Sequence, residues 1–463
     1  MSIPLESQPK HVGVDDPPLF PLSLSPFEHS MLIDDSPSYP MAFKIEVQLS
    51  GFLDKGALSE SLLEALIRHP LLCCRVKWQG GLPKWNWSAS FAPRVQFFDN
   101  MDRHPSEGIE FLDLTNECGL RLWAHCNYVS TQLIFQFHHA CCDGVGSLQF
   151  FADLCFAYAR RTGDASLIRN QSLLEPQCLM TRHHVLKRRV VANPPRLLAR
   201  LRGMIREHIK HFRSKPVSLA VPGNLVSPLK QLEHEIQSLV LDTKTSHGLR
   251  RVSLSHGVTV NDILTRDLLL TLQDWNLLHN DHRKEGALRI LVPVNLRAKG
   301  DELLPAANLI GYAFVTRRAR DLADPDELLK GIAHDTRAIH RYKLAWIYLD
   351  GLARLKRLRL LKLSHLILGR RCQATAIHSH LGTAINLLTS KLERVGERAL
   401  IGNLQLEEII AVPPIRSLTH LAVASYWLGN RLMVNLRCDP HKYSSAHAKL
   451  LLEMFVKRIS TTA

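Results

Sequence analysis

The feature that most constrains this fold is the alternation of short apolar strands with amphipathic helices on both sides of a basic stretch broken by prolines. Before that stretch, the periodicities predict strands over 42–50, 71–78, 121–127 and 132–137, and helices over 54–68 and 144–162. After it, they predict strands over 234–241, 288–294, 311–315, 374–378, 407–412, 421–428 and 431–438, and helices over 244–255, 258–277 and 446–459. This alternation predicts α/β layers in two halves, with a site between them.

The length of 463 residues accommodates two to three domains. We expect a flexible leader over 1–26, a first subdomain over 27–181, a basic linker or helix over 182–230 and a second subdomain over 231–463. The leader is rich in Pro, Ser and Asp and lacks a basic region followed by an apolar core, so it does not resemble a secretory signal. We therefore expect a cytoplasmic protein.

The composition is that of an ordinary globular protein, with 46% hydrophobic and 22% charged residues. The longest apolar stretches, such as Leu421 to Leu428, are much shorter than the roughly 20 residues that cross a bilayer. The ten cysteines include adjacent pairs but no C-x-x-C motif. We expect reduced, mostly buried thiols, and the spacing of Cys141 and Cys142 predicts no metal site.

The formal charge of +15 is concentrated in two segments. Residues 182–215 contain eleven Lys or Arg and one acid, residues 341–371 contain nine and one, and the rest of the chain has a slight excess of acids. Both segments place apolar residues at helical spacing between basic ones. This pattern is typical of peripheral membrane binding, although two ordinary surface helices would produce it as well. No zinc finger, helix-turn-helix or RNA-binding motif accompanies the charge, so we expect no nucleic acid partner.

The most informative motif is His138–Gly144, with the sequence HHACCDG. It follows an apolar strand directly and precedes a helix, so its polar side chains stand at the rim of a sheet. Alternation sends His138 and His139 to opposite sides, and only one of them can face a given pocket. A histidine is neutral near pH 7 and can remove a proton from a hydroxyl or an amine.

This motif resembles the HHxxxDG motif of the chloramphenicol acetyltransferase-like superfamily, which includes peptide-synthetase condensation domains and wax ester synthase/diacylglycerol acyltransferases. Other landmarks of the superfamily follow in its order, at His69–Val76, Thr259–Asp262, Pro293–Arg297 and Asn308–Gly311. The chain departs from the superfamily where S-N-x-G is usual, because Ser379–Gly382 reads SHLG. The resemblance extends over nearly the whole chain.

The resemblance implies two chloramphenicol acetyltransferase-like subdomains, each a two-layer α+β sandwich, in a pseudo-dimeric arrangement with a tunnel at their interface. His139 would be the general base facing this tunnel, and His138 would be structural. Asp143 would form a structural ion pair with Arg297, and Gly144 would let the turn pass close to neighbouring backbone. Residues that could line the substrate channel are Asn261, Asp262, Asn308, Ser379 and His380.

The implied reaction transfers an acyl group from a thioester to an acceptor hydroxyl without a covalent intermediate, a metal or a bound cofactor. Acyl-CoA or acyl-phosphopantetheine would be the cosubstrate, and the hydroxyl of Ser379 or a backbone N–H would stabilise the oxyanion. The basic helices favour a lipid-related acceptor and an anionic membrane surface as a partner. Amide formation, or a non-catalytic protein that binds a lipid or a carrier-linked chain, is the alternative. We expect a monomer.

Overall fold

The structure is a computed structural model that describes residues 19–99, 108–163, 173–182, 214–223, 236–279, 286–298, 300–368, 371–389, 392–396 and 398–463. Most of the predicted leader and most of the predicted basic linker over 182–230 lie outside these residues. The expectations for those two segments therefore stay predictions.

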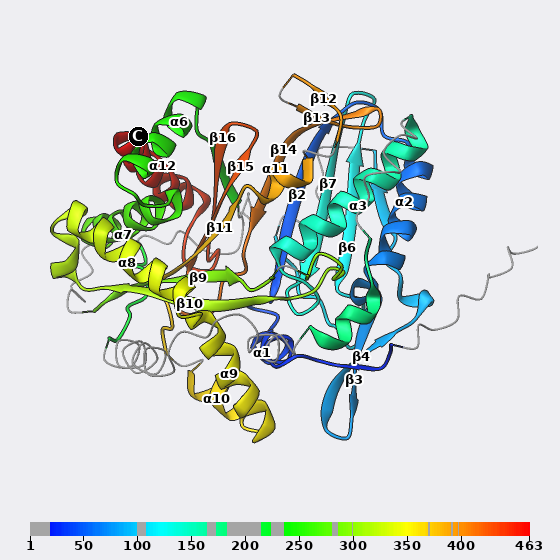
Figure 1. Ribbon diagram of the computed structural model, residues 1–463, viewed down its shortest axis with the longest axis horizontal. Coiled ribbons are helices and arrows are strands. Elements are labelled where there is room, and N and C mark those ends of the chain that lie inside the picture. Colours follow the sequence, from blue (N-terminus) through cyan, green and yellow to red (C-terminus); the bar gives the residue numbers. More distant parts are fainter. Residues whose placement is uncertain are drawn as a thin grey trace, which may run out of the picture.

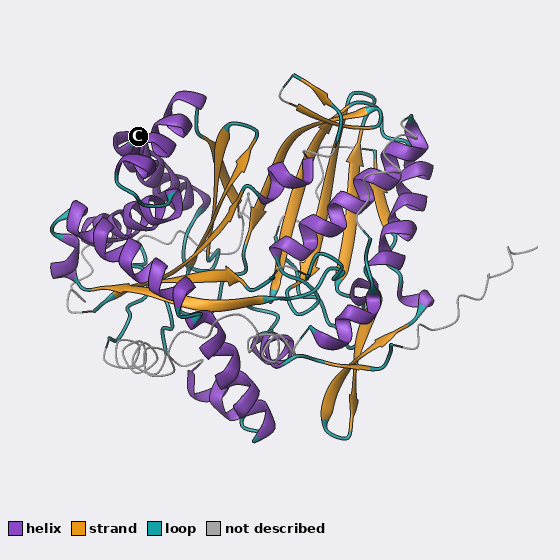
Figure 2. Ribbon diagram, in the orientation of Figure 1, coloured by secondary structure: helices purple, strands orange, loops and turns teal. Residues whose placement is uncertain are grey.

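Two lobes lie side by side, each with a large sheet covered by helices (Figures 1 and 2). The first sheet has seven strands: β12 (Arg394–Val395), β13 (Arg398–Ile401), β14 (Leu404–Val412), β2 (Ala42–Ser50), β7 (Ser130–His138), β6 (Leu120–Cys126) and β5 (Val95–Phe98), in that spatial order. Helices α2 (Lys55–Arg68) and α3 (Gly144–Thr162) pack against each other on one of its faces.

Strand β2 and helix α3 of the first lobe form where the sequence pattern predicts them. Strand β2 occupies the predicted range 42–50, with Ile45, Val47 and Leu49 buried on one face. Helix α3 is capped by the side chain of Asp143, and it ends before Gly163. The Asp143 cap and the Gly163 stop depend only on neighbouring residues, so the sequence predicts both ends of α3.

The second sheet has six strands: β10 (Ile310–Arg317), β9 (Leu288–Asn295), β11 (Ala376–Gly382), β15 (Leu421–Leu428), β16 (Arg431–Cys438) and β8 (Ile236–Val240), in that order. Helices α6 (Thr243–Ser255), α7 (Val260–Leu278), α8 (Pro325–Arg341) and α12 (Ser445–Thr462) cover it. A core under α7 and α12 belongs to this lobe, whereas a larger core begins in the first lobe and continues across the boundary to residues such as Leu309 and Tyr312.

Three strands from the second half of the sequence, β12, β13 and β14, belong to the first sheet. Strand β14 lies within the range 231–463 that the sequence assigns to the second subdomain, yet it pairs antiparallel with β2 in the first sheet, for example Ile409 with Val47. Strand β14 therefore extends the first sheet beyond β2, although it belongs in sequence to the second subdomain. Chain order alone does not reveal this, because a strand pattern does not identify its partner strand.

A small third sheet contains β1 (Leu22–Ser23), β4 (Leu82–Trp87) and β3 (Cys74–Gln79). The strand predicted over 71–78 is wrong in its first half, where Pro70–Cys73 forms a 3₁₀ turn. Proline fixes its own φ near the helical value and has no N–H for a strand ladder, so it favours this turn. Strands β3 and β4 form a hairpin that projects from the first lobe (Figure 1).

The second basic segment is helical, as predicted, but it is divided in two. Helix α9 (Leu344–Arg357) and helix α10 (Leu361–Leu368) are separated by Arg359, whose φ of 59° is left-handed. Helix α1 (Pro26–Asp34) contacts both of them. The remaining elements are α11 (Ala384–Thr389) and 3₁₀ turns at Ala89–Phe91, Pro176–Thr181 and Ala319–Leu322. Among the described helices, none combines the length and apolar character that a bilayer crossing requires.

Candidate active site

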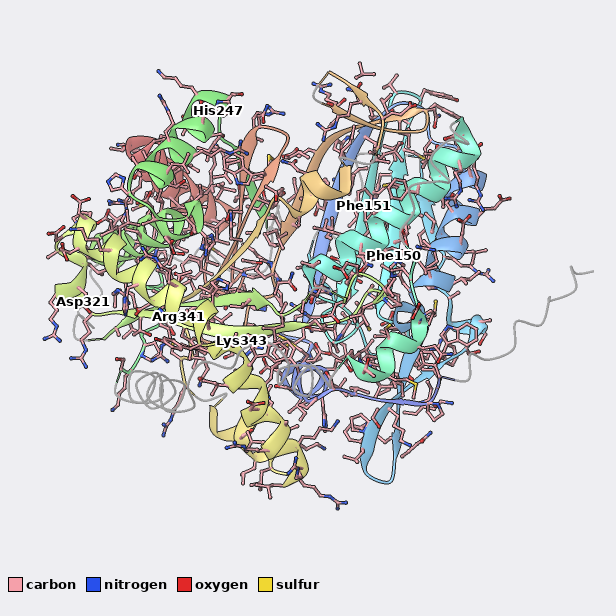
Figure 3. The ribbon with its side chains drawn as sticks, viewed as in Figure 1. Phe150, Phe151, His247, Asp321, Arg341 and Lys343 are labelled. Carbon is pink, nitrogen blue, oxygen red and sulfur yellow. The ribbon has the colours of Figure 1, made fainter. Side chains whose placement is uncertain are left out.

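The HHACCDG segment lies at the boundary between the two lobes. Strand β7 ends at His138, a short turn follows, and α3 begins at Gly144. The turn is anchored in the first lobe by the buried side chains of α3, including Phe150 and Phe151 (Figure 3). The residues between strand and helix are thus held at the C-terminal end of β7, at the boundary with the second lobe.

His139 is held by contacts from both lobes. Its backbone N–H donates to the carbonyl of Met41 at 2.7 Å, and its ring meets the Phe43 ring edge-on with centroids 5.2 Å apart. From the second lobe, the Asn308 amide donates to the His139 carbonyl at 2.6 Å and lies 3.2 Å from Nδ1. Only 7% of the residue is exposed, so the orientation of the ring is well defined.

The environment of His139 keeps the imidazole neutral. Burial is the largest influence and lowers its pKa to about 4, although a hydrogen bond to the residue's own backbone carbonyl acts in the opposite direction. Nδ1 faces the Asn308 amide at 3.2 Å. No described residue forms a hydrogen bond with Nε2. A neutral imidazole accepts a proton at Nε2 when Nδ1 carries the ring proton.

His138 points the other way and is fully buried. Its Nδ1 accepts the backbone N–H of Ala140 at 3.0 Å, so Nε2 carries the proton and donates to Asp35 Oδ2 at 3.1 Å. Both ring nitrogens are used in these bonds. The arrangement stabilises the turn and leaves His138 no free nitrogen for a substrate.

Asp143 joins the two lobes. Its Oδ2 is 2.8 Å from Arg297 Nη1 and also accepts the backbone N–H of Leu309 at 2.8 Å. Its Oδ1 accepts the N–H of Gly146 at 2.8 Å and caps α3. The carboxylate is 1% exposed and all its bonds are structural, so it does not contact the His139 ring as a triad member would.

The close backbone approach expected at Gly144 occurs at Gly146 instead. A Cβ on Gly146 would lie 2.9 Å from the carbonyl oxygen of Ala307, which is backbone and cannot move aside. A Cβ on Gly144 would lie 3.3 Å from the flexible end of Leu381. The backbones of the two lobes therefore approach closely at Gly146, in the first turn of α3, where only a residue without a side chain fits.

The predicted channel residues of the second lobe do not all gather around His139. Asp262 forms a capping box with Thr259, which is the actual N-cap of α7, so the pair Asn261 and Asp262 belongs to a helix start. Among the described contacts, none joins either residue to the HHACCDG segment. Of the five predicted channel residues, Asn308 has direct contact with His139.

Ser379 and His380 lie on β11, where the side chains alternate between its two faces. His380 Nδ1 is 2.8 Å from Ser425 Oγ, and the same hydroxyl is 3.0 Å from Nε2 of the buried His378. Ser379 is partly exposed. The adjoining Leu381 is the residue that approaches Gly144, which brings the end of β11 next to the site.

Sequence reasoning missed several residues that organise the site. Asp35 holds His138, and Arg416 pairs with Asp34 at 2.9 Å while contributing to the lowered pKa of His139. His69 bridges the lobes by accepting the N–H of Ala306 at 2.9 Å on Nδ1. These residues are far apart in sequence, and no local spacing connects them to His139.

The two adjacent cysteines are not suited to nucleophilic chemistry. Cys141 and Cys142 are buried, and burial raises the pKa of both thiols well above the ordinary value. Within the described residues, no group of three or more His, Cys, Asp or Glu side chains is placed to hold a metal ion.

Comparison with known proteins adds distant sequence relatives. No protein-family model matches the chain. Uncharacterized proteins from two Mycobacterium tuberculosis strains, CDC 1551 and H37Rv, are each 25% identical to it over 327 residues. These matches cover 65% of this chain and 68% of the relative.

Solved structures establish the fold. Polyketide synthase associated protein 5 from Mycobacterium tuberculosis has a TM-score of 0.61 with 17% identity, over 95% of this chain and 97% of that one. The starter condensation domain of rhizomide synthetase, solved with C8-CoA, has a TM-score of 0.62 with 10% identity (95% and 94%). The trichothecene 15-O-acetyltransferase of Fusarium sporotrichioides has a TM-score of 0.62 with 13% identity (94% and 93%).

These likenesses define the class to which the fold belongs. It is the fold that condensation domains and acetyltransferases share. The chain has the two-subdomain chloramphenicol acetyltransferase-like fold, with the HHACCDG segment at the boundary of its subdomains.

Proposed function

We propose that the protein is an acyltransferase that moves an acyl group from a thioester to an acceptor hydroxyl, with His139 as the general base. One observation carries this proposal: a neutral imidazole, fixed by both lobes, whose Nε2 accepts no hydrogen bond from any described residue. The fold agrees with it, because a solved neighbour of this fold is an O-acetyltransferase.

In the proposed reaction, His139 Nε2 removes the proton of the acceptor hydroxyl while the oxygen attacks the thioester carbonyl. The resulting tetrahedral intermediate collapses, the C–S bond breaks, and the imidazolium returns the proton to the sulfur. Ester and free thiol are the products, so protons and charges balance without a covalent enzyme intermediate. General base catalysis contributes about 10²–10⁴-fold, and the rest comes from holding both substrates together.

The donor in this proposal is acyl-CoA, or an acyl chain on a carrier phosphopantetheine. The starter condensation domain solved with C8-CoA supports a CoA thioester, since it has the same fold. The acceptor is a lipid-related alcohol, and the protein works in the cytoplasm at the surface of a membrane. Substrates reach His139 through a channel between the lobes.

The test is a thiol-release assay with a panel of acyl-CoAs and with alcohol and amine acceptors. His139→Ala is expected to lower turnover by about 10²–10⁴-fold. The matched control is His247→Ala, an exposed histidine of α6 far from the lobe boundary, which should retain full turnover (Figure 3). Unchanged turnover in His139→Ala would remove His139 from the mechanism. Turnover with amines alone would make the enzyme an amide-forming transferase, and none with any pair would leave a binding protein.

A further inference from the structure

Two projections extend from the same end of the molecule. The α9–α10 pair projects from the second lobe and the β3–β4 hairpin from the first, with α1 between them (Figure 1). We call the exposed side chains of these two projections the basic tip surface: Lys77, Trp78, Leu82, Arg354, Arg357, Leu358, Arg359, Leu360, Lys362 and Leu363.

The basic tip surface exposes large apolar side chains. Leu358 is 64% exposed and Leu363 is 52% exposed on the helices, while Trp78 is 48% exposed and Leu82 is 40% exposed on the hairpin. Single exposed leucines are common on protein surfaces, but here they gather at the tips of two adjacent elements. An exposed tryptophan among leucines is typical of segments that enter a membrane interface.

Basic residues surround these apolar side chains. Residues 74–87 and 344–368 together contain eight Lys or Arg and a single acid, Asp350. Of the exposed cations, Arg357, Arg359 and Lys362 form no ion pair with any described carboxylate. This charge is therefore available to an anionic partner.

The two projections form one surface. The ammonium group of Lys362 on α10 lies 5.2 Å from the ring centroid of Trp78 on β3, a cation–π contact between the lobes. The His29 ring of α1 lies next to the same indole, with centroids 6.1 Å apart. Helix α1 thus fills the space under both projections.

His29 of α1 is buried beneath this surface. The residue is 7% exposed, and neither ring nitrogen has a hydrogen-bond partner. Burial first, and then the charges of Lys356 and Lys362, lower its pKa to about 4.

We propose that the basic tip surface docks on an anionic membrane. Trp78, Leu358 and Leu363 enter the headgroup region, and the arginines and lysines meet the lipid phosphates. Charge complementarity favours lipid over a protein partner, because the cations ring an apolar centre at the tips of two projections.

This surface is connected to the candidate site. Asp34, at the end of α1, pairs with Arg416 at 2.9 Å and lies 3.5 Å from His365 of α10. Arg416 in turn contributes to the lowered pKa of His139. The docking proposal rests on the proposed function in one respect, namely that the enzyme would reach a lipid substrate from this end of the molecule. Membrane binding itself is measured without any acyl donor.

The experiment is flotation of the full chain with vesicles of phosphatidylcholine alone and of phosphatidylcholine with phosphatidylglycerol. Anionic vesicles should bind the protein, and neutral ones should bind it far more weakly. Each removed charge should weaken binding about fivefold, so the triple variant Arg357→Gln/Arg359→Gln/Lys362→Gln should lose about 100-fold. Trp78→Ala should weaken binding to anionic vesicles as well.

The matched control is Lys244→Gln/Arg251→Gln, which removes exposed charges from α6 at the opposite end of the molecule (Figures 1 and 3). The control should bind like the wild type. Equal losses in the control and the triple variant, or equal binding to neutral and anionic vesicles, would overturn the proposal. Thiol release from a water-soluble acyl-CoA should be unchanged in the triple variant, so the docking surface and the transferase activity can fail independently.

Discussion

The two lobes each carry a pair of histidines on the strand nearest the site, and the pairs differ in what holds them. In the first lobe, His138 ends β7 and His139 directly follows it, whereas His378 and His380 lie on β11 in the second. Burial is the main cause that lowers the pKa of His139, His378 and His380, to about 4, 3 and 4. All three rings are therefore neutral at pH 7.

The partners separate the two pairs. His139 is held by its own backbone carbonyl and by Asn308 from the opposite lobe. His378 and His380 share the Ser425 hydroxyl, and Thr265 lies 3.3 Å from His378 Nδ1. Because a hydroxyl has one proton and two lone pairs, the protons of this second pair can be arranged in either direction. The two pairs thus differ in their partners: His378 and His380 share one hydroxyl, whereas no described residue forms a hydrogen bond with Nε2 of His139.

The largest expected effect separates His139 from His380. His139→Gln should lower turnover in the thiol-release assay by about 10²–10⁴-fold, because glutamine cannot accept the proton. His380→Gln should stay within a few-fold of the wild type. Equal losses in the two variants would break the distinction between the pairs and make His380 part of the chemistry.

The next effect concerns the ion pair beside His139, which the second pair lacks. Asp143→Asn keeps a good helix cap but leaves Arg297 without its charge partner, so it should cost about 3–5 kcal/mol of unfolding free energy. Urea denaturation measures this loss. In the double variant Asp143→Asn/Arg297→Gln the loss should be smaller than the sum of the single losses, and strict additivity would argue against a direct pair.

Asp35→Asn tests the carboxylate that holds His138. The charge-assisted hydrogen bond at 3.1 Å should be replaced by a neutral one, at a cost of about 1.5–3 kcal/mol in urea unfolding. The KM for acyl-CoA should not change, since His138 faces protein. A selective rise in KM with unchanged stability would place His138 in the channel instead.

Ser425→Ala makes the corresponding change in the second lobe. Loss of the shared hydroxyl removes neutral hydrogen bonds to His378 and His380, and the expected cost is about 1 kcal/mol. Thermal or urea unfolding measures it beside Asp35→Asn. If Ser425→Ala proved the more destabilising of the two, the second pair would be the more tightly held one.

The smallest effect is on the pH profile. Because the pKa of His139 is lowered to about 4, its base form persists well below neutrality and is lost only as the pH falls through about 4. Between pH 7 and pH 5, kcat/KM should therefore change by less than about twofold. An acid limb near pH 6.5 would show that the ring is hydrated like an ordinary histidine.

Much of the fold could be predicted because its signals are local. Strands β2, β15 and β16 occupy their predicted ranges, and α3 begins and ends at its Asp143 cap and Gly163. The turn at Pro70–Cys73 was missed because its apolar residues also fit a buried strand.

The site could be predicted only in part. The motif places His138 and His139 next to each other in sequence at the end of a strand. It does not show which distant residues contact them. Asp35, Asn308 and Arg416 come from three separate segments, and tertiary packing alone brings them together. Asn261 and Asp262 illustrate the reverse case, a motif that the fold uses for a helix start.

The crossing strand β14 has a consequence for biosynthesis. The ribosome releases β2 early, but its edge partner emerges only when the chain has reached residue 412. Until then the nascent first lobe presents an unpaired edge along β2, the kind of edge at which chains aggregate. The first sheet therefore cannot be completed until most of the second lobe has been synthesised, so the two lobes cannot finish folding one after the other.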